Sequence, residues 1–396
     1  MTFIKNSTSC STLIDVEDFK ATRPSRMNET EIIVEDDNEY KHKLHIPLTP
    51  SESIDNCLRN NPLLSSTAKK ALAKRSEFFL SKGTFSTSSV GKGRGPTIYV
   101  HQREVAHVSN EQYDNRGAIL VSDSATTCHI IGVRSYSCCN RKRILGSLCH
   151  LDSIQNGTCV RKMIEEHLSF HKCLEKCLNR NQVHMEVHII GGYLDQDRTS
   201  EETTSHILNI LAKAAKTCRS KLEMKLKTCV VTGLNDCATY EDNVSNAPII
   251  RGLALDISSG QVHLFNKVHE ICAGPAKTLR RVRLWAPALQ NNFLLEVHTW
   301  EKEEICVEPF EYAPFPDIEL FLQLPDDTLL QYSSTSPECE ADDFCDIMRI
   351  TCTFVKDIPV SDVFGKDRKR IVYHSKKRIL NSGDDDLFEY DWKRSD

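Results

Sequence analysis

The stretch Val121 to Arg134 (VSDSATTCHIIGVR) contains a cysteine, Cys128, directly after small polar residues that follow a short apolar run. We interpret the apolar run as a strand that ends in a turn, with a second apolar element starting at once. A cysteine in such a turn can present its sulfur among backbone N–H donors, which lower a thiol pKa and form an oxyanion pocket. The pattern therefore indicates a nucleophilic cysteine.

Two histidines are candidates for the base that would serve this cysteine. His129 is adjacent to Cys128 in sequence, so in an extended chain its side chain points to the opposite side. His150, in the segment GSLCHLD, can return to Cys128 from a neighbouring strand, and we expect it to be the base. With 17 cysteines and 15 histidines in 396 residues, some such pair is guaranteed, so the pair alone is weak evidence.

The other cysteines and histidines raise the alternative of a zinc site. No pair has the C-x2-C spacing of a zinc finger or ribbon, although several candidates are close in sequence: Cys138, Cys139, Cys149 and His150, followed by His171, Cys173 and Cys177. We expect no metal and no cofactor. Most of the cysteines are expected to be reduced and to act as small buried hydrophobic residues.

Composition excludes several classes of protein. Forty per cent of the residues are apolar and 27% are charged, and the net charge of −5 leaves no basic excess for nucleic-acid binding. The first residues lack the apolar core of a secretory signal, and no apolar run approaches the ~20 residues of a membrane span. We expect a cytoplasmic or nuclear protein with neither nucleic acid nor membrane as partner; the oligomeric state stays open.

The chain divides into an N-terminal extension and one domain. Residues 1–42 are polar and acid-rich without periodicity, and we expect them to be disordered, with residues 43–396 forming a single catalytic domain. Asn61 is expected to cap a helix that begins at Pro62. The Ser- and Gly-rich stretch Thr84 to Gly95 is expected to be a flexible loop.

Short β-branched and apolar runs predict strands from residue 97 onward: 97–108, 117–122, 183–190, 228–232, 249–257, 261–265, 294–298 and 305–312. The Ser258–Gly260 turn predicts a hairpin between the strands that flank it, and the last two strands are expected to pair. Helices are expected after Gly191-Gly192, opened by a capping box from Thr199 to Glu202, and from Pro337 to about Phe354. Hairpin-dominated sheets with interspersed helices predict an α+β fold.

One predicted strand carries a row of polar side chains. In Val183 to Ile190 (VHMEVHII), the residues His184, Glu186 and His188 alternate with apolar ones. Such a row is either a metal-binding face or a solvated strand face, and we expect the solvated face.

Seven segments, in this order, resemble the eukaryotic protein N-terminal asparagine amidohydrolase family. They are SDSATTCHIIGVR, GSLCHLD, EVHIIGGYLDQDRTSEETTSHIL, TGLND, PIIRGLALDISSGQVH, YAPFP and STSP. The resemblance runs from about Tyr40 to the C-terminus. It departs at residues 1–42 and in a cysteine-rich, insertion-like stretch from Cys138 to Arg143.

The chain also resembles, more distantly, the bacterial chemoreceptor glutamine deamidases. Ser122 lies six residues before Cys128, the segment GSLCH supplies His150, and a strand ends in Gly191-Gly192. The similarity implies an α/β sandwich of the cysteine deamidase type, a β-sandwich-like core with flanking helices in which Cys128, His150 and Ser122 converge. It also implies that the two glycines allow close backbone approach. A turn-capping role for Ser122 is the alternative.

The resemblance to the eukaryotic family implies hydrolysis of the side-chain carboxamide of an N-terminal asparagine to aspartate and ammonia, which feeds the ubiquitin-dependent N-degron pathway. In this mechanism Cys128 attacks and forms a thioester, His150 transfers protons, and Ser122 orients His150. Backbone N–H groups around Thr127 and Cys128 would stabilise the oxyanion. The alternatives are a deamidase of internal glutamines and a catalytically idle, thiol-rich interaction protein.

The partner implied is a protein or peptide with a free N-terminal asparagine, whose α-ammonium needs a carboxylate. Asp123, Asp152 and Asp236 lie in segments shared with the family, and we favour Asp123 and Asp236. Each aspartate could instead cap a turn. The YAPFP segment, Tyr312 to Pro316, could either wall the substrate pocket or pack in the core.

Overall fold

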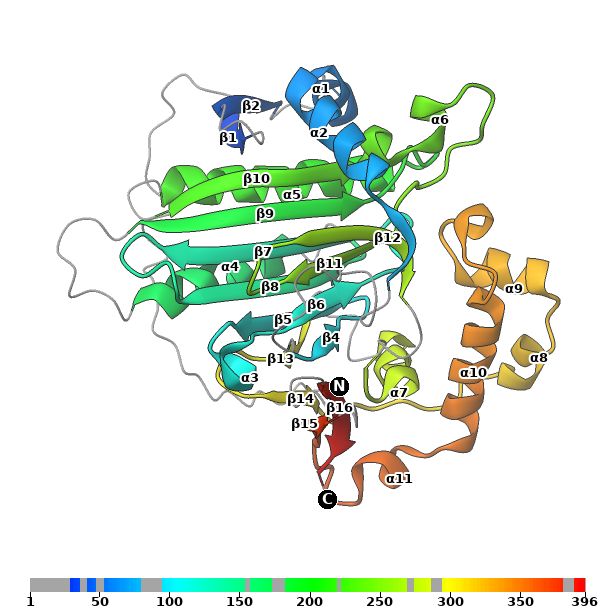
Figure 1. Ribbon diagram of the computed structural model, residues 1–396. Helices are drawn as coiled ribbons and strands as arrows, with labels where there is room; N and C mark the ends of the chain where they lie inside the picture. Colours follow the sequence, from blue (N-terminus) through cyan, green and yellow to red (C-terminus); the bar gives the residue numbers. More distant parts are fainter. Residues whose placement is uncertain are drawn as a thin grey trace, which may run out of the picture.

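The computed structural model describes residues 29–35, 41–47, 53–79, 95–153, 157–172, 182–218, 222–268, 274–285, 294–379 and 388–395. Within these ranges the strands form three open sheets, and helices lie around them (Figure 1). The predicted α+β fold is therefore confirmed.

An eight-stranded mixed sheet forms the centre of the molecule. From edge to edge its strands are β13 (Leu295–His298), β5 (Glu104–Ser109), β8 (Ile144–Leu151), β7 (His129–Ser137), β9 (Val183–Gly191), β10 (Leu222–Val231), β1 (Glu29–Glu35) and β2 (Lys41–Pro47). Strand β7 is antiparallel to both of its neighbours, β8 and β9. His150, on β8, and Cys128, directly before β7, therefore belong to two neighbouring inner strands of this sheet.

A five-stranded sheet packs on one face of the central sheet. Its order is β3 (Ser76–Phe79), β12 (Val262–Val268), β11 (Gly252–Asp256), β6 (Ile119–Ser122) and β4 (Thr97–Tyr99). Glycine at position 146 of β8 permits the close approach of the sheets, because a Cβ there would lie 1.9 Å from the Cδ1 atom of Ile257. The predicted hairpin around Ser258–Gly260 is confirmed as β11 and β12.

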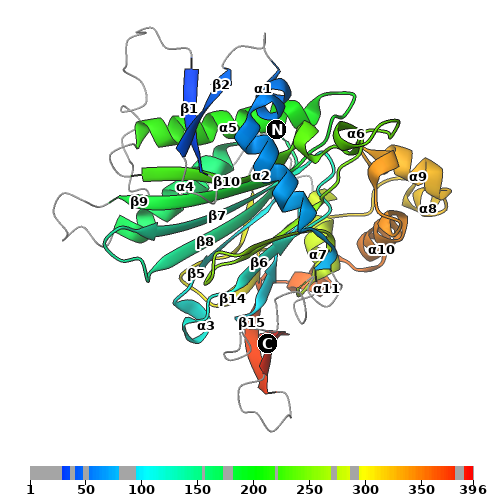
Figure 2. The ribbon, with the colours of Figure 1, turned by 45° about the horizontal axis from the view of Figure 1, so that its top comes forward.

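Two long helices cover the opposite face of the central sheet. They are α4 (Gly157–Lys172) and α5 (Thr199–Thr217). Figure 1 shows them behind the large sheet, with β6, β11 and β12 in front, and Figure 2 shows the same layers from another angle. The result is a helix–sheet–sheet sandwich, as the resemblance to the deamidases implied.

The remaining elements flank this sandwich. Near the start of the described chain lie α1 (Ile54–Asn60) and α2 (Pro62–Ala73), and shorter helices are α3 (Gln112–Asn115) and α6 (Cys237–Tyr240). The C-terminal part contributes α7 (Lys277–Val282), α8 (Ile318–Leu322), α9 (Asp326–Ser333), α10 (Phe344–Asp357) and α11 (Val360–Phe364), with a sheet of β14 (Glu304–Val307), β15 (Ile371–Ile379) and β16 (Phe388–Arg394).

The C-terminal elements share a small core of their own. Tyr312, from the YAPFP segment, is buried in it, donates a hydrogen bond of 2.8 Å to the carbonyl of Ile358 and lies against Phe354. Phe315 packs edge-on against Phe321. The segment therefore serves core packing, one of the two alternatives that its sequence left open.

Several local predictions hold. The Asn61 side chain accepts hydrogen bonds of 3.1 Å from the N–H groups of Leu63 and Leu64 and so caps α2, which begins at Pro62. Strand β9 alternates as expected over its first half. The predicted loop at Thr84 to Gly95 falls almost entirely outside the described residues.

Other local predictions were wrong. Thr199 and Glu202 form no capping box, because the residue that precedes α5 is Arg198. The carboxylate of Asp195 instead accepts hydrogen bonds from the N–H groups of Thr199 and Ser200. The late helix begins at Phe344 rather than Pro337, after a single 3-10 turn.

The strands expected to pair with each other near residue 300 both exist, but they pair elsewhere. Strand β13 runs parallel to β5, and β14 is antiparallel to β15. Pairing of this kind depends on chain that is distant in sequence, so a local pattern did not specify it.

The N-terminal boundary also differs from the expectation. Strand β1 lies within residues 1–42 and extends the central sheet by pairing in parallel with β10, while β2 pairs with β1 across residue 42. The disordered extension therefore cannot include Glu29–Glu35. Residues 1–28 and 36–40 lie outside the described residues. Among the helices that the structure describes, none is both long and apolar enough to cross a membrane.

Candidate active site

Ser122 and His150 meet between the two packed sheets. Ser122 ends β6 in the small sheet and His150 lies near the end of β8 in the central sheet, and the Ser122 Oγ atom is 2.9 Å from Nδ1 of His150. Both side chains are buried. The second ring nitrogen of His150, Nε2, is buried and has no hydrogen-bond partner among the described residues.

Burial also fixes the charge state of this histidine. Removal from water lowers the pKa of His150 to about 3, and the neighbouring ring of His129 adds to the shift. The imidazole is therefore neutral near pH 7. If Nδ1 carries the hydrogen and donates it to Ser122, the lone pair of Nε2 is available to accept a proton.

Cys128 immediately precedes β7, beside the strand that carries His150. In the ladder between these strands, His129 lies opposite Leu151 and Ile130 lies opposite His150. The carbonyl of Cys128 accepts a hydrogen bond of 2.9 Å from the N–H group of Gly192. The cysteine is thus tied to the ends of β7 and β9, and its side chain is half-buried.

The Gly191-Gly192 pair is required by this backbone contact. Gly191 has a φ of +115°, and a Cβ atom at this position would lie 2.2 Å from the Cys128 carbonyl oxygen. A side chain here would displace the cysteine. The structural role implied for these glycines by the resemblance agrees with this geometry.

Three charged groups act on the sulfur. Burial raises the pKa of the Cys128 thiol, and the carboxylates of Asp152 and Glu340 raise it further, whereas the guanidinium of Arg103 lowers it. The cysteine is therefore a neutral thiol in the free protein. Nucleophilic attack requires a base or a change in the surrounding charge.

The turn before Cys128 is tied to the STSP segment. Ser336 donates a hydrogen bond of 2.8 Å to the Thr126 hydroxyl, and the hydroxyls of Thr127 and Thr335 lie 3.3 Å apart. Within the described ranges, the backbone N–H groups of Thr127 and Cys128 donate no hydrogen bond. These two donors are therefore available to an oxyanion.

His129 faces the other side of the central sheet. Its Nε2 atom lies 2.7 Å from the Thr204 hydroxyl on α5, and burial lowers its pKa to about 4. This orientation is the one expected from the alternation of side chains along a strand. His129 is thus separated from the sulfur by the sheet itself.

The two favoured aspartates have structural partners. Asp123 accepts hydrogen bonds from the Tyr99 hydroxyl and from the N–H group of Val268. Asp236 caps α6 and accepts hydrogen bonds of 2.9 Å from the N–H groups of Leu194 and Ala238. Neither carboxylate is among the charges that act on Cys128. Their proposed contact with substrate stays a prediction that this geometry does not favour.

The carboxylates that raise the pKa of the Cys128 thiol are instead those of Asp152 and Glu340. Asp152, one of the three aspartates considered, lies two residues after His150 and forms an ion pair with Arg103. Glu340 was missed, although it follows the STSP segment by three residues. Arg103 was also missed, since nothing in its local sequence indicates that its turn reaches β8.

Other polar clusters have local partners. His184 pairs with Glu223, Glu186 pairs with Arg134, and His188 is buried beside Thr228, so the row on β9 is not the solvated face that we expected. Among the described side chains, no group of three or more His, Cys, Asp or Glu is arranged to hold a metal ion. Cys173 and Cys177 lie outside the described residues, and the absence of a metal stays a prediction.

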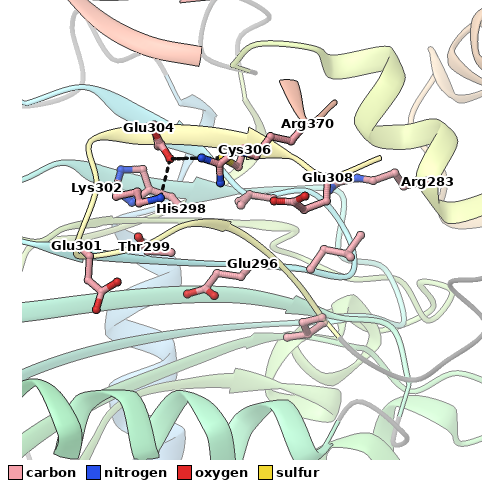
Figure 3. A pocket seen from close by; sticks show the side chains of 13 residues that line it. Arg283, Glu296, His298, Thr299, Glu301, Lys302, Glu304, Cys306, Glu308 and Arg370 are labelled. Atoms are coloured by element: carbon pink, nitrogen blue, oxygen red, sulfur yellow. Dashed lines mark hydrogen bonds and ion pairs between the residues drawn. The ribbon is translucent and has the colours of Figure 1, made fainter. Parts of the chain in front are cut away.

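A pocket of about 350 Å³ lies elsewhere, lined by residues of β13 and β14 together with Arg283 and Arg370. Figure 3 shows its charged lining, with Arg283 at one end and Glu301 at the other. None of the predicted site residues lines it. The pocket therefore does not belong to the cysteine site.

The α+β sandwich places a half-buried cysteine directly before the strand next to the one that carries a buried histidine, which is paired with a buried serine. These are residue types that a hydrolase site uses. Comparison with known proteins places it more narrowly. The family model of protein N-terminal asparagine amidohydrolase matches residues 86–381. The chain therefore belongs to this family, the resemblance seen in its sequence is confirmed, and the protein is an amidohydrolase.

Relatives from animals and plants support this assignment. The protein N-terminal asparagine amidohydrolase of Sus scrofa is 30% identical over 264 residues, which cover 66% of this chain and 75% of the relative. The protein of the same name from Mus musculus is 29% identical, over 71% of this chain and 81% of the relative. That from Arabidopsis thaliana is 23% identical, over 69% and 77%.

Proposed function

We propose that this enzyme hydrolyses the side-chain carboxamide of an N-terminal asparagine, giving N-terminal aspartate and ammonia through a Cys128 thioester. The observation that carries the chemistry is the buried Nε2 atom of His150, which has no hydrogen-bond partner among the described residues. A neutral imidazole oriented by Ser122, on the strand beside Cys128, is the arrangement that a thiol nucleophile needs.

The reaction follows from these groups. His150 Nε2 accepts the proton of the Cys128 thiol as the sulfur attacks the carboxamide carbon. The oxyanion accepts hydrogen bonds from the N–H groups of Thr127 and Cys128, an effect worth ~3–4 kcal/mol per donor in comparable sites. The imidazolium then protonates the leaving ammonia, and the neutral imidazole activates the water that hydrolyses the thioester.

Asp152 and Glu340 are the carboxylates that we propose for the substrate's α-ammonium. Asp152 follows His150 by two residues, and the segment before Glu340 contacts the turn before Cys128. Both carboxylates also raise the pKa of the Cys128 thiol, so we place the ammonium in the same site as the reacting carboxamide. Glu340 is partly buried, and burial raises its pKa. A cationic ligand would stabilise its charged form. We replace Asp123 and Asp236 by this pair in the proposal.

The product suggests the biological role. An N-terminal aspartate differs from asparagine by one charge, and a destabilising N-terminus of this kind belongs to the N-degron pathway. We propose this destination from the family resemblance.

A peptide panel tests the function. Free Asn-initiated peptides should gain one dalton and release ammonia, while N-acetylated and internal-Gln peptides should react at least about tenfold more slowly, because an unpaired buried carboxylate costs ~1–3 kcal/mol. Gln-initiated peptides should also react more slowly, because their extra methylene displaces the carboxamide from the thiol. Cys128→Ala should abolish turnover and leave the melting temperature close to that of the wild type. Equal turnover of free and acetylated peptides would refute the N-terminal assignment, and faster turnover of internal glutamine would favour the alternative deamidase.

A further inference from the structure

Arg103 is held in a fixed position beside the strand that carries the base. Its N–H group donates a hydrogen bond of 2.9 Å to the carbonyl of His150, and its own carbonyl accepts one of 2.8 Å from Leu295. Its φ of +62° places the side chain in a tight turn. The guanidinium forms an ion pair with Asp152, which also accepts a hydrogen bond of 3.1 Å from Gln102.

A buried charge cluster fixes this turn from behind. The next residue, Glu104, is 1% exposed and forms ion pairs with Arg280 and Arg283. One Glu104 oxygen also accepts the N–H group of His101 at 2.9 Å, which closes the turn. Arg283 extends from this cluster to the pocket of Figure 3. The Arg103 guanidinium is therefore positioned by the protein before substrate arrives.

Glu340 is positioned from a different part of the chain. It follows the STSP segment, which contacts the turn before Cys128, and the Ser334 hydroxyl donates a hydrogen bond to its carboxylate. Among the described residues, the charged groups that act on the Cys128 thiol are two carboxylates, which raise its pKa, and one guanidinium, which lowers it. His150 adds no charge to this set, because it is neutral at rest.

These charges oppose thiolate formation in the free enzyme, and an added cation offsets that opposition. Two carboxylates against one guanidinium leave an excess negative charge at a partly buried sulfur. An α-ammonium beside Asp152 and Glu340 would make the number of positive charges equal to the number of carboxylates. An acetylated N-terminus would bring no charge and leave the excess in place.

We propose that the Arg103–Asp152–Glu340 group makes attack by Cys128 depend on the substrate's own α-ammonium, which offsets the carboxylate charge and allows the thiol to transfer its proton to His150. This inference rests on the proposed function. Arg103 is then a positioning residue: it holds Asp152 in place and prevents the two carboxylates from suppressing the thiolate entirely. Selection for a free N-terminus thus acts on the chemical step as well as on binding.

The first experiment needs no substrate. The rate at which iodoacetamide alkylates Cys128 in the full chain is measured against pH by peptide mass spectrometry. Glu340→Gln and Asp152→Asn should move the midpoint to lower pH and speed alkylation at pH 7.5 by about three- to tenfold, since one pKa unit is a factor of ten. The same variants should lower kcat/KM for an Asn-initiated peptide, so the two readouts change in opposite directions.

Arg103 should behave in the reverse sense. Arg103→Gln should move the midpoint to higher pH and slow both alkylation and turnover, and Arg103→Lys should restore part of each because it returns the positive charge. Arg134→Gln is the matched control, because it removes another arginine–carboxylate pair, with Glu186, from the same sheet. It should lower the melting temperature without moving the alkylation midpoint.

The second experiment uses substrate. The pH profile of kcat/KM reports the free enzyme and that of kcat reports the bound complex. The limb of the pH profile that reports ionisation of Cys128 should therefore lie at lower pH for kcat than for kcat/KM. In Glu340→Gln the difference in pH between these two limbs should be smaller. Equal limbs in the wild type, or unchanged alkylation in both carboxylate variants, would overturn the inference. If alkylation changes as expected but no Asn-initiated peptide reacts, the proposed function fails and the charge effect stands.

Discussion

The central sheet carries buried histidines on both faces, and the two faces differ in what the ring nitrogens meet. On the face toward the small sheet, His150 is hydrogen-bonded to Ser122 through one nitrogen, and its other nitrogen has no partner among the described residues. On the face toward α4, serine hydroxyls lie between histidine rings and connect them. On the first face, an unpartnered ring nitrogen lies on the strand next to Cys128. On the second face, the hydroxyls and rings form a connected network that leaves Nδ1 of His171 without a partner among the described residues.

The network on the helix side contains three histidines and two serines. The Ser147 hydroxyl lies 2.6 Å from Nδ1 of His107 and 2.8 Å from Nε2 of His167. The Ser135 hydroxyl lies 2.6 Å from Nδ1 of His167 and 3.0 Å from Nε2 of His171. Both nitrogens of His167 are therefore satisfied, which suits a role in holding α4 against the sheet.

The comparison separates two properties that often occur together at active sites. Burial lowers the pKa of His107 to about 4 and that of His150 to about 3, so a perturbed pKa is common to both faces. What distinguishes His150 is an unpartnered ring nitrogen on the strand next to a half-buried cysteine. His129 and His171, on the helix face, also have a buried ring nitrogen without a partner among the described residues. The position of His150 on the strand next to Cys128, rather than the pKa shift or the unpartnered nitrogen alone, therefore indicates the functional histidine.

The largest expected effect is obtained by removing one histidine from each face. His150→Ala should lower kcat by about a thousandfold, within the usual range for a general acid–base, with a modest change in melting temperature. His167→Ala should leave kcat within about threefold but lower the melting temperature, because two buried serine hydroxyls lose a partner at ~1–3 kcal/mol each. Steady-state kinetics and calorimetry on both variants check this. The reverse result would exchange the roles of the two faces.

A second expected effect is loss of stability in acid, to which both faces contribute. Burial holds the pKa of His107, His129 and His298 at about 4, below the ordinary value of about 6.5. Between these pH values the unfolded chain binds protons that the folded protein does not, so stability falls as pH drops through this window. Each histidine should account for about 1 kcal/mol at pH 5.5.

Urea unfolding at pH values from 7.5 to 5.0 measures this loss. His107→Gln should make the decline shallower by about one proton in the slope of stability against pH, because one histidine no longer contributes. A free energy of unfolding that stays constant from pH 7.5 to 5.0 would mean that these histidines are hydrated or already charged in the folded protein.

Local sequence was informative wherever a structural element depends on its own residues. The cap at Asn61, the alternation in β9 and the turn at Ser258–Gly260 each need only neighbouring side chains, and each was predicted. The same alternation bears on the choice of Asp123 as a substrate contact. Consecutive strand residues point to opposite sides. Because the Ser122 side chain points toward His150, the side chain of Asp123 is expected to face away from the site.

The features that were missed depend on contacts between distant parts of the chain. Glu340 reaches Cys128 only because the STSP segment contacts the turn at Thr126 and Thr127. Arg103 reaches the site only through the register of β5 with β8. The pairing of β1 with β10 likewise needs the assembled sheet, so a polar segment near the N-terminus gave no sign of it.

The smallest expected effect compares the two serines that contact histidines on opposite faces. Ser122→Ala removes the partner of His150 Nδ1, so the ring can rotate or change tautomer, and kcat should fall by about tenfold while KM changes little. Ser147→Ala removes a hydroxyl that contacts two rings and should cost at least as much in melting temperature, with kcat nearly unchanged. Ser122→Thr, which keeps the hydroxyl, should recover part of the lost rate. If Ser122→Ala and Ser147→Ala lowered kcat equally, the Ser122 hydroxyl would only support the fold, which is the turn-capping alternative that its sequence left open.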